Sequence, residues 1–344
     1  MTTADPRAGV LDFLRRYGLL LDGETAQLTP LTGGVSSDLW KVELPGRTLC
    51  VKGALAQLKV QKEWRAPTSR NRVEYQWLQF AGAIAPGQVP EVLAHDERAG
   101  LFAMQYLPPA DQPVWKNSLL AGIIRPHDAA AVGDLVGRLH AAGAADPATR
   151  ITFATDDNFD ALRIDPYFRV TARANPDLAD RINQLAVRTA GTHLAVVHGD
   201  VSPKNILLGA HGPILLDAEC GWFGDPAFDV AFCVNHLLLK AVLMPARSTD
   251  LHRSAVALLR AHGPRIDWEP VDAFTGRVAT LLPLLALARV DGASPVEYLN
   301  PAQQRHVRAL ARSLLGSRTA TIDDVMDPWI VAAAGAAPVK EPTP

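Results

Sequence analysis

Cysteine is scarce in this sequence, and its few copies are not arranged as a metal site or a disulfide framework. Only three of the 344 residues are cysteine, at positions 50, 220 and 233. They form no CxxC pair and have no histidines at zinc-ligand spacing. We therefore expect three free thiols in a reducing compartment, buried in the core rather than acting as nucleophiles.

Strong net charge and long uninterrupted apolar runs are also absent. The net charge is −2, which argues against nucleic-acid or membrane-surface partners. The most apolar stretch, "DVAFCVNHLLLKAVLM", is interrupted by Asn235, His236 and Lys240, so it predicts a buried helix rather than a membrane span. The N-terminal segment lacks the apolar core of a signal peptide and predicts an amphipathic helix. We expect a cytoplasmic protein, and its alanine- and arginine-rich usage is typical of a GC-rich bacterium.

Strand-like and helical patterns divide the chain into two lobes. Residues 26–53 alternate between apolar strands and turns, a helix follows around Glu74, and a hairpin ends at a double proline. Residues 1–108 therefore predict a small lobe of five strands with a leading and a further helix, and residues 109–330 a larger, mainly helical lobe. The expected fold class is α+β, with residues 331–344 as a flexible tail. In the second lobe we expect two short strands and helices at 227–244, 251–262, about 270–290 and 301–316.

One short segment, "VVHGDVSPKNILLG", places polar residues between two apolar strands. Asp200 and Asn205 lie five residues apart in its loop, and Asp217 follows a hairpin of two short strands, with its turn expected at His211-Gly212. The hairpin brings Asn205 and Asp217 together at its open end, where a carboxylate and an amide oxygen suit Mg²⁺ held through substrate phosphates. Asp200 then stands nearby as a proton acceptor. This arrangement matches phosphoryl transfer, in which a loop Asp accepts the hydroxyl proton while Asn and Asp hold the metal.

The first lobe contains residues suited to binding nucleotide phosphates. Lys52 lies on the third strand between apolar neighbours, and Glu74 on the following helix is its expected ion-pair partner, with Glu63 as the competitor. The turn "TGGVSSD" offers main-chain N–H groups and hydroxyls to phosphates. Taken alone, the turn would be interpreted as a plain hairpin turn and the lysine as a charge on an edge strand. The turn residues expected at the phosphates are Gly33, Gly34, Ser36 and Ser37.

Two further segments of this lobe have weaker signals. The segment "AMQYL" is expected to cross between the lobes, where main-chain groups of Gln105 and Leu107 would contact adenine. The segment 58–72 is rich in lysine and arginine. For it we favour a solvated loop and helix start over a phosphate-attracting rim.

Three motifs together resemble one family. They are "HGDVSPKN" (198–205), "LLDAE" (215–219) and "GDPAFDVA" (224–231), in the order and spacing of the aminoglycoside phosphotransferase and choline kinase family. The resemblance covers roughly residues 25–310. It implies a protein-kinase-like fold and the ATP- and Mg²⁺-dependent transfer of the γ-phosphate to a hydroxyl group of a small molecule.

The resemblance also implies roles for individual residues. Asp200 resembles the catalytic base, and Asn205 and Asp217 resemble the Mg²⁺ ligands. Lys52 and Glu74 resemble the ion pair that binds phosphates. His198 and Asp229 resemble structural residues that support the catalytic loop. Asp225 is either a helix cap or a carboxylate that holds this loop.

The sequence departs from protein kinases at two places. Ser202 replaces the lysine that follows the catalytic Asp by two residues, and Lys204 lies two residues further on. Lys204 is either a catalytic cation at the γ-phosphate or a surface lysine that caps the loop. Asp217-Ala218-Glu219 replaces the DFG motif and there is no APE segment, which argues against a regulated protein kinase. A non-catalytic nucleotide-binding module is the other alternative, and the intact set of site residues argues against it.

The acceptor is the least determined feature. Residues 154–168 are rich in aspartate, which suits either a cationic acceptor, such as an amino sugar or aminoglycoside, or a polar loop with helix-capping residues. Aromatic residues of the second lobe either bind a choline-like cation or form core. Sugars and amino alcohols are further candidate acceptors. Glu219 contacts either the acceptor or the water shell of the metal. The acidic residues considered are Asp156, Asp157, Asp160, Asp165 and Glu219, and the aromatic ones are Tyr167, Phe168, Trp222, Phe223 and Trp268.

Overall fold

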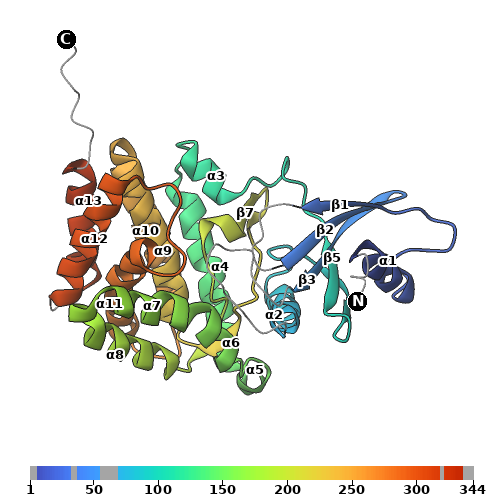
Figure 1. Cartoon of the computed structure of the whole chain (residues 1–344), viewed down its shortest axis with the longest axis horizontal. Helices are drawn as coiled ribbons and strands as arrows, with labels where there is room; N and C mark the ends of the chain where they lie inside the picture. Colours follow the sequence, from blue (N-terminus) through green and yellow to red (C-terminus); the bar gives the residue numbers. More distant parts are fainter. Residues whose placement is uncertain (1–5, 32–36, 55–68, 318–320, 336–344) are drawn as a thin grey trace, which may run out of the picture.

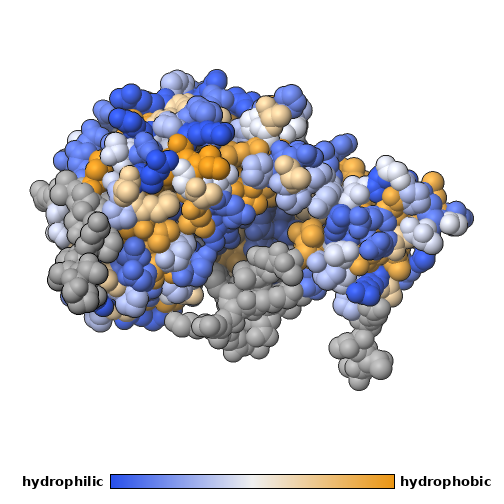
Figure 2. All heavy atoms as spheres, turned by 90° about the horizontal axis from the view of Figure 1, so that it is seen from above, coloured by the Kyte–Doolittle hydropathy of each residue, from blue (hydrophilic) through white to orange (hydrophobic). Residues whose placement is uncertain are grey.

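A computed structural model describes residues 6–31, 37–54, 69–317 and 321–335 of the chain. The protein consists of a small lobe built on one sheet and a larger helical lobe, with helix α4 (Pro126–Ala145) standing between the sheet and the other long helices (Figure 1). The surface is hollowed between the two lobes (Figure 2). The predicted two-lobed α+β fold is therefore confirmed.

The small lobe contains the expected five strands. Its elements are α1 (Pro6–Arg16), β1 (Gln27–Leu31), β2 (Ser37–Leu44), β3 (Arg47–Ala54), α2 (Arg70–Ile84), β4 (Val92–Asp96) and β5 (Leu101–Gln105). The strands form one antiparallel sheet in the order β1-β2-β3-β5-β4. The β2–β3 turn is tight because Gly46 adopts φ +72°, a conformation that favours glycine. Helix α1 buries Phe13 and Leu14 in a small core that it shares with this sheet.

Helix α2 connects the two lobes through its buried face. Trp77, Leu78 and Ala81 are at most 2% exposed and belong to the large hydrophobic core of the helical lobe. Phe102 of β5 belongs to the same core. The helix is thereby fixed against both lobes, so Glu74 on it has a defined position relative to the sheet and to the catalytic loop.

The large lobe is mainly helical and contains two small strand pairs. The pairs are β6 (Ala195–Val197) with β9 (Trp222–Gly224), and β7 (Ile206–Gly209) with β8 (Gly212–Leu215). The first helices are α3 (Trp115–Leu120), α4, α5 (Pro147–Thr152), α6 (Asp156–Phe159), η1 (Asp160–Arg169), α7 (Val170–Ala174), η2 (Pro176–Leu178), α8 (Ala179–Ala190) and η3 (Pro203–Asn205). The later ones are α9 (Pro226–Leu243), η4 (Pro245–Arg247), α10 (Ser248–His262), η5 (Gly263–Arg265), α11 (Val271–Asp291), α12 (Pro301–Gly316) and α13 (Ile322–Gly335).

The most apolar helix is the centre of this lobe. Helix α9 packs against α10 and α11, and it and α11 are the two helices of the described chain that are long and apolar enough to cross a membrane. The apolar window of α9 is 94% buried inside the protein and that of α11 is 61% buried. The interior position of α9 confirms the prediction of a buried helix, since neighbouring helices already cover its apolar surface.

The structure corrects the sequence reading at three places. Residues 156–169 are helical rather than a polar loop, and η1 has wide π-helical turns with Pro166 inside it. The expected tail begins inside α13, which extends to residue 335 because Met326 and Trp329 are buried in the helical core. The β7–β8 turn lies at residues 210–211, one residue before the expected position, and Gly212 at φ +117° begins β8.

Candidate active site

Asp229, in the first turn of α9, holds the loop that follows β6. Its Oδ2 accepts a hydrogen bond from the main-chain N–H of His198 at 2.7 Å, and its Oδ1 accepts one from Gly199 at 2.8 Å. Gly199 has φ +74°, and a Cβ atom there would lie 2.5 Å from the carbonyl oxygen of Cys220. The loop can therefore turn sharply only with glycine at this position, and the turn presents Asp200 to the space between the lobes.

His198 joins this loop to the strand that precedes Asp217. Its Nδ1 accepts a hydrogen bond from the N–H of Asp200 at 3.2 Å, so its Nε2 carries the proton and donates to the carbonyl of Leu216 at 3.0 Å. Burial lowers the pKa of His198. The edge of the Trp77 ring system lies against it, with ring centroids 4.8 Å apart. A neutral, packed histidine agrees with the structural role expected for His198.

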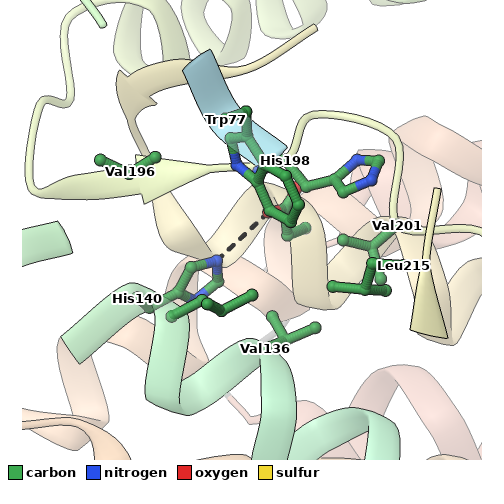
Figure 3. A pocket seen from close by; sticks show the side chains of 9 residues that line it. Trp77, Val136, His140, Val196, His198, Val201 and Leu215 are labelled. Carbon is green, nitrogen blue, oxygen red and sulfur yellow. Dashed lines mark hydrogen bonds and ion pairs between the residues drawn. The ribbon is translucent and has the colours of Figure 1, made fainter. Parts of the chain in front are cut away.

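A buried histidine pair lies next to Asp229. His140 Nε2 is 3.2 Å from Asp229 Oδ2 (Figure 3). His140 Nδ1 is 3.0 Å from Nε2 of His262. Both histidines are 1% exposed. The sequence analysis missed these residues because they lie on α4 and α10, far from the catalytic motif in the chain. They extend the support of the catalytic loop into the helical core.

Asp200 is a buried carboxylate surrounded by cations. It is 5% exposed, and its Oδ2 lies 3.0 Å from Nη2 of Arg163, 3.2 Å from Nζ of Lys204 and 2.9 Å from Nδ2 of Asn205. Burial would raise the pKa of Asp200, but the charges of Lys204 and Arg163 outweigh it and lower that pKa. Asp200 is therefore ionised at neutral pH. Lys204 lies beside it, as its catalytic reading requires, although the Lys204 side chain is half exposed.

Arg163 is a site residue that the sequence analysis did not identify. Its guanidinium also donates through Nε to the carbonyl of Gly199, so it holds both the loop and the Asp200 carboxylate. Arg163 is 6% exposed on η1, within the apolar run "ALRIDPYF". An arginine on the buried face of such a run is itself a signal, because a buried guanidinium requires an anionic partner.

Lys52, Glu74 and Asp217 form a buried triad between the lobes. Lys52 Nζ lies 2.7 Å from Glu74 Oε2 and also binds Asp217. Burial alone would lower the pKa of Lys52, but the two carboxylates overcome this and raise it. Burial raises the pKa of Glu74 to about 7, while Lys52 holds the pKa of Asp217 low against the effect of burial. The expected ion pair thus forms, and the competing Glu63 lies outside the described residues.

Asn205 and Asp217 meet at the open end of the β7–β8 hairpin. The main-chain N–H of Leu216 donates to the carbonyl of Asn205 at 2.9 Å, which closes the hairpin next to both side chains. Asp217 has φ +65° and is the one non-glycine residue of the described chain with positive φ, a strained conformation typical of functional sites. No group of three or more histidine, cysteine or acidic residues able to hold a metal occurs in the described ranges. The amide oxygen of Asn205 and the carboxylate of Asp217 are nevertheless donors of the type that suits Mg²⁺, which keeps most of its coordination for water and phosphate.

Glu219 and Arg70 form an ion pair that corrects one expectation. Arg70 begins α2 and is fully buried, so this one arginine of the basic segment 58–72 is not solvated. Its Nε donates to Glu219 Oε2 at 3.1 Å. The pair joins α2 to the chain just after Asp217. In the role expected for it at the acceptor or the metal, Glu219 would act while paired with Arg70. Arg72 is exposed and pairs with Glu97.

The remaining nucleotide-binding predictions are only partly described. Gly33, Gly34 and Ser36 lie outside the described residues, whereas Ser37 is buried at the start of β2 opposite residue 54. Gln105 ends β5, and its N–H donates to the carbonyl of Glu91 at 2.8 Å. That N–H is already bonded, so an adenine contact at Gln105 would use its carbonyl. Leu107 follows, half-buried, at the passage between the lobes.

The expected acidic wall is largely engaged by neighbouring side chains. Asp156 accepts hydrogen bonds from Trp222 Nε1 at 3.0 Å and lies 2.8 Å from His193 Nε2, and Asp160 forms a two-pronged ion pair with Arg169. Asp157 is exposed. The aromatic residues considered for a choline-like cation include Trp222 and Phe168, which are 1% and 0% exposed and belong to the core.

Asp225 is a helix cap. Its Oδ1 accepts a hydrogen bond from the N–H of Ala227 at 3.0 Å, at the start of α9. Arg277 on α11 donates through Nε to both carboxylate oxygens at 3.0 and 3.1 Å. Burial nevertheless raises the pKa of Asp225. Of the two readings of this residue, these contacts favour the capping one, because they lead to α9 and α11.

The relatives found by sequence comparison are named as phosphotransferases or kinases. The model of the family described as "Phosphotransferase enzyme family" matches residues 27–249. A methylthioribose kinase of Pectobacterium atrosepticum is 24% identical over 292 residues, covering 76% of this chain and 72% of that protein. Another methylthioribose kinase, from Escherichia coli O45:K1, is 26% identical, covering 62% of this chain and 58% of that protein.

Solved structures share the fold. Amicoumacin kinase hAmiN, in complex with AMP-PNP, Ca²⁺ and Ami, superimposes with a TM-score of 0.56 at 14% identity, covering 92% of this chain and 96% of that one. A choline/ethanolamine kinase family protein from Mesorhizobium loti gives a TM-score of 0.51 at 20% identity, covering 95% and 99%. These similarities support the kinase-like fold.

Proposed function

This chain belongs to the phosphotransferase enzyme family and is a small-molecule kinase, and we propose that it transfers the γ-phosphate of Mg²⁺-bound ATP to a hydroxyl group of its acceptor. The observation that carries the proposal is the convergence of Asp200, Asn205, Asp217 and Lys52 between the lobes. An ionised carboxylate, two oxygen donors and a buried ammonium are the groups that phosphoryl transfer needs. A non-catalytic module would not need all four, and the missing activation segment disfavours a protein kinase.

Lys52 and the hairpin residues hold the nucleotide in this proposal. Lys52 binds the phosphates, and Glu74 fixes the direction of its ammonium group. Asn205 and Asp217 hold Mg²⁺, which when bound neutralises charge on the phosphate oxygens. The main chain at Gln105 and Leu107 is proposed to contact adenine, and Gly33, Gly34, Ser36 and Ser37 are the proposed contacts to the phosphates.

Asp200 accepts the proton of the acceptor hydroxyl. The bond from the acceptor oxygen to the γ-phosphorus forms, the bond from that phosphorus to the β–γ bridging oxygen breaks, and ADP leaves. The low pKa of Asp200 makes it a weak base, so its first role is to orient the hydroxyl, and it takes the proton as the new bond develops. Lys204, beside Asp200, supplies positive charge to the phosphoryl group in flight.

The acceptor is a small hydroxyl compound in this proposal. The curated relatives named methylthioribose kinase support a sugar-like acceptor, and amino sugars, aminoglycosides and amino alcohols stay in the set. Asp157 and Asp160 remain candidate contacts for a cationic acceptor. We propose a bacterial, cytoplasmic enzyme, because the reaction uses ATP and the most apolar long helix, α9, is interior.

The test is ATP consumption against a panel of sugars, amino sugars, aminoglycosides and amino alcohols, with product detection by mass spectrometry. We expect one class to give a phosphorylated product, and Asp200→Asn to lower kcat by about 10²- to 10⁴-fold with little change in nucleotide affinity. Asp267→Asn, at an exposed aspartate of the same lobe, is the matched control and keeps wild-type rates. Near wild-type turnover in Asp200→Asn would overturn the assigned mechanism.

A further inference from the structure

Lys240, on α9, is a buried cation without an acidic partner. Its side chain is 1% exposed, its Nζ donates only weakly to the carbonyl of His236 at 3.4 Å, and it lies 5.2 Å from the ring centre of Tyr298. No carboxylate of the described residues lies within ion-pair distance of it. A buried ammonium without a counter-ion is costly, so its presence calls for an anion that binds there.

The other buried cations of the molecule follow the opposite rule. In the part of the chain that the structure describes, four lysine or arginine residues are less than a tenth exposed: Lys52, Arg70, Arg163 and Lys240. Lys52 binds Glu74 and Asp217, Arg70 binds Glu219, and Arg163 binds Asp200. Lys240 is the exception, which argues that its partner is not part of this chain.

Arg289, on α11, adds a second cation without a carboxylate. Its Nη1 donates to Tyr167 Oη at 3.1 Å and to Ser294 Oγ at 3.0 Å, and no carboxylate of the described residues lies within ion-pair distance of it. Its Nε and the hydroxyl of Tyr298 are buried without a hydrogen-bond partner. Two cations and two unused donors thus lie around one place in the helical lobe, which is a donor set suited to an anion.

Contacts connect this cluster to the catalytic carboxylate. The guanidinium of Arg163, bound to Asp200, lies 5.6 Å from the ring centres of both Tyr167 and Phe232. Tyr167 receives the hydrogen bond from Arg289, and the Phe232 ring lies 5.3 Å from that of His236, one helical turn before Lys240. The cluster is therefore within a few side chains of Asp200, on the side of the helical lobe.

Positive charges predominate around Lys240. Burial, and then the charges of Arg289, Lys240 and Lys204, lower the pKa of His236 well below its usual range. Burial and the charge of Lys116 lower the pKa of Lys240 to about 8. Glu297, the acidic residue that acts on Lys240, is bound to Lys116. No carboxylate of the described residues therefore forms a direct ion pair with Lys240 on α9 or Arg289 on α11.

We infer that the acceptor carries an anionic group, a carboxylate or a phosphate, that binds between Lys240 and Arg289 while its hydroxyl lies at Asp200. This inference rests on the proposed function and narrows its acceptor class. It departs from the cationic acceptor expected from the aspartates of residues 154–168, of which Asp156 and Asp160 are already engaged by neighbouring side chains. Among the described residues of this lobe, the buried charge without an ion-pair partner is a cation, Lys240.

The first test measures binding without relying on turnover. Asp200→Asn protein with saturating AMP-PNP is titrated with glucose, gluconate, glucose 6-phosphate and glucosamine, and with a library of other hydroxy acids, sugar phosphates and their neutral parents, by thermal shift and calorimetry. We expect an anionic compound to bind at least about 10-fold more tightly than its neutral parent. The gluconate and glucose 6-phosphate arms separate a carboxylate from a phosphate.

Two substitutions locate the anion. In the Asp200→Asn background, Lys240→Met and Arg289→Met each weaken binding of the anionic compound by about 10-fold or more and leave AMP-PNP affinity unchanged. Lys116→Met, at a cation of the same lobe that Glu297 already neutralises, changes it less than about 3-fold. Lys240→Met is expected to fold at least as stably as wild type, because an apolar side chain of similar volume replaces an unpaired charge.

The outcomes are distinct. Preference for neutral or cationic compounds, or equal anion binding by wild type and Lys240→Met, overturns the inference. Absence of phosphorylated product in every arm of the wild-type kinetic assay contradicts the proposed function instead, because the anion measurements do not require turnover. In that assay, an active Lys240→Met enzyme with a raised KM for the anionic acceptor and an unchanged KM for ATP supports both.

Discussion

Lys52 and Lys240 are both buried lysines, one on each side of the active site, and their surroundings are opposite. Lys52, on β3, is held by Glu74 and Asp217, and these carboxylates raise its pKa. Lys240, on α9, is held by no carboxylate of the described chain, and burial lowers its pKa to about 8. In the proposed mechanism, the nucleotide side thus carries its own counter-ions, which position the ammonium before ATP binds. The proposed acceptor side leaves its charge for the ligand to neutralise.

Removing the compensated lysine gives the largest expected effect. Lys52→Met leaves Glu74 and Asp217 without their cation, so we expect the free energy of unfolding to fall by roughly 3 kcal/mol and kcat to fall by about 10³-fold. Urea unfolding and steady-state kinetics measure the two quantities. Lys41→Met, at a half-buried lysine of β2 paired with Glu43, serves as the control and stays near wild type. If Lys52→Met lost neither stability nor rate, the claim that Glu74 and Asp217 need Lys52 as their counter-ion would be wrong.

Lys204 tests the charge at the catalytic carboxylate. Lys204→Ala is expected to lower kcat by about 10²-fold, and Lys204→Arg, which keeps the charge, to restore most of it. Lys204 also lowers the pKa of Asp200, so its loss moves the acid limb of the kcat/KM profile to higher pH. Both are read from pH-dependent initial rates. Unchanged turnover and an unshifted pH profile in Lys204→Ala would show that Lys204 is a surface lysine that caps the loop.

The uncompensated lysine makes stability depend on pH in a defined direction. The folded-state pKa of Lys240, about 8, lies below its ordinary 10.5, so the unfolded chain binds more protons between these values. The stability of wild type relative to Lys240→Met therefore rises as pH increases from 8 to 10.5, by up to about 3 kcal/mol.

Matched urea titrations of the two proteins at pH 7.5, 9 and 10 measure this difference. The groups that act on Lys240 are Lys116, Cys233, Arg289 and Glu297, and they are common to both proteins. A relative stability that fell with pH, or that did not change, would show that Lys240 is compensated in the folded protein.

The buried histidine pair is expected to give the smallest effect. His262→Phe keeps the stacking on Phe274, whose ring centre lies 4.9 Å away, and removes the contact with His140. Because Asp229 still holds the loop through two main-chain hydrogen bonds, we expect about 1 kcal/mol of lost stability and less than about 5-fold in kcat. Thermal unfolding and kinetics check it. A loss of 100-fold in kcat at unchanged stability would place His262 in the catalytic machinery.

Much of the site could be predicted because its residues are close together in the chain. Asp200, Asn205 and Asp217 are separated by one loop and one hairpin, whose alternation is visible in the sequence. Lys52 and Glu74 lie on consecutive elements, and the structure brings their side chains together. Local spacing fixes such pairs, since short elements leave few ways to arrange them.

Residues that reach the site from distant elements could not be predicted in this way. Arg163 and Arg70 had no local pattern that named Asp200 and Glu219 as their partners. The aspartates of residues 154–168 suggested an acidic wall because sequence shows their charge and not the cations packed against them. Whether a charge is free or neutralised depends on what packs beside it.

The sequence alone determined the two-lobed fold, the catalytic loop and the class of reaction, because periodicity and close spacing are properties of the chain itself. Only the tertiary structure decided which buried charges have partners. It placed Lys240 on α9 and Arg289 on α11, about 50 residues apart in sequence, with no ion pair to either cation among the described residues. The charge balance of the proposed acceptor site depends on the packing of these helices, because ion pairing requires contact in space and leaves no periodic signal in the sequence.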